Sequence, residues 1–113
     1  MMKNDLIYIQ HIKECVDKIN EYTKGFDRGK FLKNSLVQDG VIRNLEIIGE
    51  ASKQLSPEFR EQYAEIEWRK IAGMRDKLIH NYMGVDVDAV WGVIVEVLPE
   101  FKNEINRILK EQS

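Results

Sequence analysis

The 113-residue chain has one cysteine, two prolines and no long apolar run. The single Cys15 excludes an internal disulfide and suits a reducing compartment. No apolar stretch approaches the roughly 20 residues that a membrane-spanning helix needs. Polar residues also interrupt the apolar positions that follow the first few residues, so no signal-peptide core is predicted. We therefore expect a cytoplasmic protein that has no membrane partner.

The sequence also lacks an excess of positive charge. Its formal net charge is −2 and its pI is about 5.7, which excludes the broad basic surface of a protein that coats nucleic acid. DNA is not expected as a partner, and any contact with RNA must be local. The seven glycines stand isolated, which excludes a glycine-rich phosphate loop.

What the sequence does contain is apolar residues at helical spacing. They predict four principal helices, over residues 6–23, 35–55, 67–82 and 86–108. No alternating strand pattern, internal repeat or interdomain linker is present. Because each apolar stripe can be buried only against the others, we expect an all-α, antiparallel four-helix bundle with an extra short helix, forming a single domain over residues 1–113.

Helix-starting and helix-breaking residues locate several boundaries. Ser56 and Pro57 form an N-terminal signal, a capping hydroxyl followed by proline, and predict a short helix to about residue 63. Asp86 or Asp88 is expected to cap the last helix. Pro99 lies inside the apolar pattern of that helix and should kink or split it.

The predicted helix over residues 67–82 carries the candidate chemistry. At 100° per residue, Arg75 falls among apolar residues on one face, so it either extends to the surface or is held by a carboxylate in a cleft. Asp76 and His80 are four residues apart, so the carboxylate can orient the imidazole, although an ordinary exposed pair has the same spacing. Arg75 and His80 point about 140° apart on a straight helix. A site that uses both requires a distorted helix end or a second chain.

The pattern Arg75-Asp76-x-x-x-His80-x-Tyr82 resembles the R-x-x-x-x-H-x-Y motif of the HEPN superfamily, and specifically of its HepT-like toxins. The similarity includes residues 41–51, 68–74 and 85–91, and covers nearly the full length. Gly40 departs from it, since the family usually has alanine there. Glycine at this position should loosen the helix by up to about 1 kcal/mol.

The resemblance implies a HEPN-like homodimer whose motif helices meet at a shared cleft. It implies a metal-independent endoribonuclease without a cofactor, the toxin of a type VII toxin–antitoxin system. Arg75 and His80 would be catalytic, and Asp76 and Tyr82 would support them. Tyr82 would also accept AMP from the partner, a minimal nucleotidyltransferase antitoxin.

Further residues receive supporting roles. Lys70, Lys77 and Arg69 would supply local positive charge for the RNA backbone. Glu46 or Glu50 could hold Arg75 from a neighbouring helix, although a solvated helix face is the usual role of such residues.

Two alternatives remain. A di-metal bundle enzyme is disfavoured because neither His11 nor His80 has glutamate three residues before it. His11, Glu14 and Cys15 share a helix face, but we interpret them as an ordinary cluster, and no metal site is predicted. The stronger alternative is a catalytically inactive HEPN-fold module that partners a nucleotidyltransferase. The intact Arg75, His80 and Tyr82 favour an active site.

Overall fold

The computed structural model describes residues 3–74, 76 and 86–112, and every regular element within these ranges is helical. The predicted all-α class is thereby confirmed. In chain order the elements are α1 (Lys3–Tyr22), α2 (Arg28–Leu32), α3 (Ser35–Lys53), α4 (Pro57–Gln62), α5 (Trp68–Ala72), α7 (Val87–Gly92), the π-helix η2 (Val93–Val97) and α8 (Leu98–Glu111). Within the described ranges, no helix is both long and apolar enough to cross a membrane.

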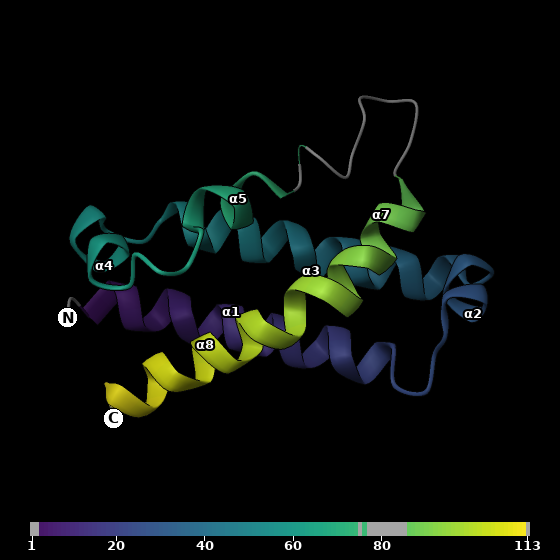
Figure 1. Cartoon of the computed structure of the whole chain (residues 1–113), viewed down its shortest axis with the longest axis horizontal. Helices are drawn as coiled ribbons and strands as arrows, with labels where there is room; N and C mark the ends of the chain where they lie inside the picture. Colours follow the sequence, from purple (N-terminus) through teal and green to yellow (C-terminus); the bar gives the residue numbers. More distant parts are fainter. Residues whose placement is uncertain (1–2, 75, 77–85, 113) are drawn as a thin grey trace.

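Three long elements form the framework (Figure 1). Helices α1 and α3 lie side by side and run in opposite directions, and α8 packs obliquely across α1. The short α5 packs against α3, and α2 lies at the far end of the molecule, where it contacts α3 and α7. The position expected for a fourth long helix is therefore taken, among the described residues, by the five residues of α5.

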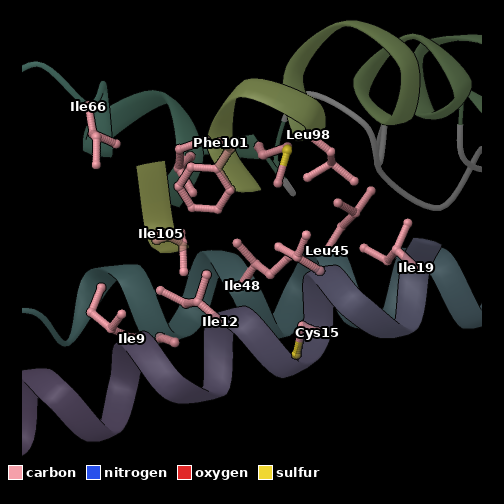
Figure 2. Packing of buried hydrophobic residues seen from close by; sticks show 14 of the residues in the cluster. Ile9, Ile12, Cys15, Ile19, Leu45, Ile48, Ile66, Leu98, Phe101 and Ile105 are labelled. Carbon is pink, nitrogen blue, oxygen red and sulfur yellow. The ribbon is translucent and has the colours of Figure 1, made fainter. Parts of the chain in front are cut away.

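The core lies where α1, α3 and α8 meet, as Figure 2 shows. The apolar stripes of these helices supply most of its fully buried side chains, with Leu98 buried where the sequence pattern predicted Val97, which is exposed. The central ones expose at most 2% of their surface: Ile9, Ile12, Ile19, Leu45, Ile48, Leu98, Phe101 and Ile105. Burial of each such side chain contributes about 1.5–3 kcal/mol, so this three-helix contact fixes the framework. Cys15 belongs to it as an apolar residue, and burial raises the pKa of its thiol.

The predicted helix starts are confirmed. The Ser56 hydroxyl and the Asp86 carboxylate each accept a hydrogen bond from the backbone N–H three residues later, and Pro57 occupies the first turn of α4. Ser56 is itself held by the buried Asp5, whose two oxygens accept its backbone N–H and its hydroxyl, each at 2.8 Å. This contact ties the start of α1 to the start of α4.

Pro99 splits the last helix, as predicted. It lies in the first turn of α8, and the residues before it form the π-helix η2. Because proline has no backbone N–H, the carbonyl four residues earlier loses its α-helical partner. In the turn before the proline, the N–H of Leu98 donates to the carbonyl of Val93, five residues back, as in a π-helix. Val95 and Val97 of this wider turn are 52% and 39% exposed, which leaves apolar surface on η2.

The single continuous helix predicted over residues 67–82 is wrong at Gly73. Helix α5 ends at Ala72, and Gly73 leaves the helical conformation with φ −88° and ψ 1°. Met74 and Asp76 are again helical. The prediction that Arg75 shares a helix face with Trp68 assumed 100° per residue along one unbroken helix. The break at Gly73 removes that assumption. The predicted stop at Gly84 lies outside the described residues.

Candidate functional site

The centre of the predicted motif, with Arg75, Lys77, His80 and Tyr82, lies outside the described residues. The described part of the candidate site is therefore its surroundings: Asp76, the end of α5 and the facing side of α3. Asp76 is exposed, and its backbone N–H donates to the carbonyl of Gly73 at 3.1 Å.

The start of the motif stretch is positioned by a close approach between α3 and α5. A Cβ atom added at Gly49 would lie 3.2 Å from the carbonyl oxygen of Ala72 and 3.5 Å from that of Ile71. Gly49 is buried and stands in the interior of α3. The missing side chain thus allows the last turn of α5 to rest directly on the backbone of α3.

Replacing Gly49 by alanine is expected to lower the free energy of unfolding by up to about 2 kcal/mol, because overpacking against backbone costs typically about 1–3 kcal/mol and the helix-propensity gain returns only about 1 kcal/mol. The two carbonyl groups belong to the backbone and cannot rotate away. Urea unfolding of the purified variant measures the change.

Gly40, in the same helix, offers a matched control. A Cβ there would meet only the ring of Tyr22, at 3.1 Å, and this side chain is 40% exposed and can move. Gly40→Ala should therefore raise the free energy of unfolding by up to about 1 kcal/mol. Equal stabilisation by both substitutions would contradict the proposed close contact at Gly49.

The other end of the motif stretch is also held. Asp86 caps α7, and two residues later the carboxylate of Asp88 accepts a 2.8 Å hydrogen bond from Nε of Arg28 in α2. The rings of Phe31 and Trp91 pack between the same two helices, with centroids 5.2 Å apart. The residues on both sides of the motif are therefore held near α3. Helix α5, before the motif, contacts α3 directly, and α7, after it, contacts α2, which contacts α3.

The predicted carboxylate partners of Arg75 lie on α3 beside the α5 contact. Glu46 is half-buried and Glu50 is exposed, and both line a hollow of about 190 Å³ together with Arg43 and Ile47. Glu50 directly follows Gly49 in the sequence, and Glu46 precedes it by about one turn. Both carboxylates therefore belong to the helix on which the last turn of α5 rests. The predicted pairing itself is not described, because Arg75 lies outside the described residues.

The predicted RNA-backbone residues Arg69 and Lys70 are exposed on α5. Nζ of Lys70 lies 3.0 Å from a carboxylate oxygen of Glu67, and both side chains are about two-thirds exposed, at 66% and 67%. Such exposed pairs stabilise a protein by about 0–1 kcal/mol. A phosphate can therefore replace Glu67 as the partner of Lys70 at little cost.

A separate acidic cleft of about 260 Å³ lies between the loop before α5, η2 and α8. Five glutamates line it: Glu65, Glu67, Glu96, Glu100 and Glu104. Burial raises the pKa of Glu104, and the carboxylates of Glu100 and Glu65 raise it further, whereas the hydrogen bond from Arg107 lowers the pKa of Glu65. In the described part of the chain, no three His, Cys, Asp or Glu side chains are grouped so that they could hold a metal ion. The negative potential of this cleft disfavours an RNA backbone there.

The sequence-based interpretation missed the role of Gly49 and the hollow that Arg43 and Ile47 line. A signal for Gly49 was present, since an isolated glycine between Ile48 and Glu50 in a strong helical pattern indicates close approach by another backbone. No comparable signal marks the hollow, because a periodic pattern identifies the faces of a helix but not the depressions between two helices.

Comparison with known proteins identifies the family. The family model for HepT-like ribonucleases matches residues 12–108. A protein of Caldanaerobacter subterraneus subsp. tengcongensis named as a candidate RNase is 40% identical over 111 residues, covering 98% of this chain and 99% of the relative. The "Probable ribonuclease HepT" of Thermococcus cleftensis is 41% identical over 110 residues, covering 97% of this chain and all of the relative.

One relative is longer. A Methanocaldococcus jannaschii protein named as a gamma-glutamylcyclotransferase and candidate RNase is 46% identical over 111 residues, which are 98% of this chain and 50% of the relative. The chain thus spans half the length of that relative and nearly the full length of the other two. No solved structure matches it. On the family match and these identities, the chain belongs to the HepT-like ribonuclease family.

Proposed function

We propose that this chain is a metal-independent endoribonuclease and the toxin of a type VII toxin–antitoxin system in the cytoplasm. The observation that carries the proposal is the intact set of Arg75, His80 and Tyr82 in a chain of the HepT-like ribonuclease family. The names of the relatives, which describe ribonucleases, support it. So does the attachment of both ends of the motif stretch to elements that contact α3.

The residues have the chemistry that RNA cleavage requires. A histidine titrates near neutral pH, so His80 can accept the proton of a ribose 2′-hydroxyl or donate one to the leaving oxygen. The 2′-oxygen then bonds to the adjacent phosphorus as the bond to the 5′-oxygen breaks. Arg75 would stabilise the negative charge on the phosphorane, and Asp76 would orient His80. Arg69, Lys70 and Lys77 would attract the RNA backbone.

Incubation of the purified protein with RNA in the presence of EDTA tests the proposed activity. Cleavage is expected, because no step in the proposed mechanism uses a metal ion. RNA that stays intact under these conditions and also with added magnesium or manganese would favour the inactive HEPN-fold module. Cleavage that EDTA stops and added metal restores would contradict the metal-independent mechanism.

The active form proposed here is a homodimer. An apolar hollow of about 410 Å³ adjoins the start of the motif, and its lining includes Met74, Ile71, Val93 and Val97. Met74 directly precedes Arg75, and the exposed valines of η2 continue the apolar surface. A second copy seated on this surface would bury the valines and bring the two motif stretches together. One site could then use Arg75 of one copy and His80 of the other.

Light scattering at micromolar concentration is expected to give twice the 13.3 kDa mass of the chain. Val97→Glu should shift the mass toward that of the monomer, because it places a charge in the apolar contact. Leu36→Glu is the matched control, since Leu36 is 81% exposed at the start of α3, and it should leave the mass unchanged. A strictly monomeric wild-type protein would rule out the shared cleft.

A further inference from the structure

Positive charge is concentrated at the end of the molecule that α2 forms. Of the 17 lysine and arginine residues in the chain, four lie in residues 24–33, together with one of its 19 aspartate and glutamate residues. The rest of the chain has 13 basic and 18 acidic residues. All four basic side chains are exposed, and we call them the basic tip: Lys24, Arg28, Lys30 and Lys33. An anionic polymer is therefore attracted to this end of a chain that is otherwise acidic.

The carboxylates around the basic tip leave its three lysines uncompensated. Asp27 and Asp86 each cap a helix by accepting the backbone N–H three residues later, and Asp88 pairs with Arg28. Among the described residues, the lysines of the tip form no ion pair. The acidic side chains of the adjoining helix ends are also not paired with them: Glu21 and Asp39. The three ammonium groups are thus available to an external anion.

Helix α2 presents two of these lysines on one side. Phe31 is fully buried and packs against Trp91, so the opposite side of the helix faces solvent. Lys30 and Lys33 are three residues apart and lie on that opposite side. Nζ of Lys30 is held 4.4 Å from the centroid of the Phe26 ring. Like charges at this spacing repel each other, and a bound phosphate would relieve the repulsion.

The basic tip is attached to the segment that follows the motif. Helix α2 contacts α7, which begins at Val87 directly after the motif stretch, and the two lie toward the same end of the molecule (Figure 1). Arg28 and Asp88 join them, and these side chains are 59% and 58% exposed, so a phosphate can replace Asp88 at little cost. The acidic cleft between η2 and α8 repels phosphate instead. Of these two charged surfaces, the basic tip is the one that attracts RNA.

We propose that the basic tip binds the phosphate backbone of the RNA substrate, away from the bond that is cut. The contacts are made to phosphates and not to base edges, so they carry no sequence preference. They favour a strand that extends beyond the reacting nucleotides over a dinucleotide, whose single phosphate is occupied at the cleavage site. This inference rests on the proposed ribonuclease function and adds to it a selection for long RNA.

A binding experiment separates the basic tip from the cleavage chemistry. The probe is a fluorescent RNA strand with 2′-O-methyl groups, which cannot be cut because the attacking hydroxyl is blocked. The double variant Lys30→Ala/Lys33→Ala should lower the slope of log affinity against log salt by about 1.4, since each phosphate contact on a single strand contributes about 0.7. Its affinity at about 0.1 M salt should fall roughly 10- to 30-fold.

The double variant Lys18→Ala/Lys53→Ala is the matched control. It removes two exposed lysines, from α1 and α3, and changes the net charge equally. It should bind the probe like the wild type, with the same salt slope. Both double variants change exposed side chains and should unfold at the wild-type temperature.

Cleavage gives a second readout, which a general loss of stability would not reproduce. For a long RNA, Lys30→Ala/Lys33→Ala should raise KM and leave kcat unchanged, because the tip does not contact the bond that is cut. For a dinucleotide, it should cut at the wild-type rate. Equal KM values for the wild type and this variant on the long RNA would contradict the inference.

The outcomes distinguish the inference from the proposed function. A wild-type protein that cleaves RNA, with a tip variant that binds the probe normally, would overturn the basic tip and leave the ribonuclease in place. Binding of the probe that depends on the tip, without cleavage of any RNA, would support the tip and overturn the ribonuclease. A tip variant that binds RNA normally but no longer binds phosphatidylserine vesicles would identify the tip as a membrane contact and overturn the inference.

Discussion

Replacing His80 by alanine is expected to lower the rate of RNA cleavage by roughly 10²- to 10⁴-fold, the usual contribution of one acid–base group. Arg75→Ala should cause a loss of similar size, since about 3–4 kcal/mol of transition-state stabilisation is typical of one charge-stabilising donor. Both variants should keep a single cooperative unfolding transition, because the centre of the buried core lies where α1, α3 and α8 meet. Cleavage of a labelled RNA under single-turnover conditions measures the rates.

Arg60→Ala provides the matched control for the loss of a cation. Arg60 lies in the last turn of α4 and lines none of the hollows described above, so its removal should leave the rate within about twofold, as for most surface substitutions. Expression of each variant in growing cells gives a second readout. Wild-type cleavage by the His80→Ala protein would remove histidine from the mechanism, even if Arg75→Ala were inactive.

Tyr82→Phe is expected to escape modification by the antitoxin and to resist neutralisation, so that the toxicity it retains is the same with and without the antitoxin. In the proposed reaction the Tyr82 oxygen attacks the α-phosphate of ATP, a new phosphodiester bond forms, and pyrophosphate leaves. The transferred AMP would place a phosphate anion and a stacking base near Arg75, where they would occupy the cation that the RNA needs. Phenylalanine has no oxygen to modify. Intact-mass spectrometry after co-expression with the transferase should show AMP adducts on the wild type and none on Tyr82→Phe.

Tyr22→Phe is the control, because Tyr22 is a partly exposed tyrosine at the end of α1 and lies outside the motif. It should gain AMP like the wild type and be neutralised like it. If co-expression suppresses toxicity and the wild-type mass stays unmodified, the antitoxin acts by binding alone and the AMP mechanism is wrong.

The sequence predicted those parts of the fold that depend on one helix at a time. Buried stripes at helical spacing located α1, α3 and α8, and capping chemistry located the starts of α4 and α7 at Ser56 and Asp86. The split at Pro99 followed from a missing N–H. Each of these signals is local, because a stripe, a cap or a proline acts through residues within one or two turns.

Features that depend on the contact between two elements could not be predicted from such local signals. The end of α5 at Gly73 was missed because the apolar pattern continues beyond it, and the close contact between Gly49 and the last turn of α5 is not visible in that pattern. The bond between Asp5 and Ser56 joins residues that are 51 positions apart. The roles of Arg75, His80 and Tyr82 remain predictions.

The burial of α8 between the stripes of α1 and α3 sets when the protein can become active during its synthesis. Leu98, Phe101 and Ile105 come from the last helix described, yet they cover isoleucines from the first. A nascent chain whose residues 98–111 are still inside the ribosome therefore cannot complete its core. Helix α7, which follows the motif, then lacks the support of α8. Premature termination before residue 98 should yield a harmless fragment. For a protein with the proposed toxic activity, the helices before α8 are then insufficient for that activity, which requires that residues 98–111 have been made and have folded onto α1.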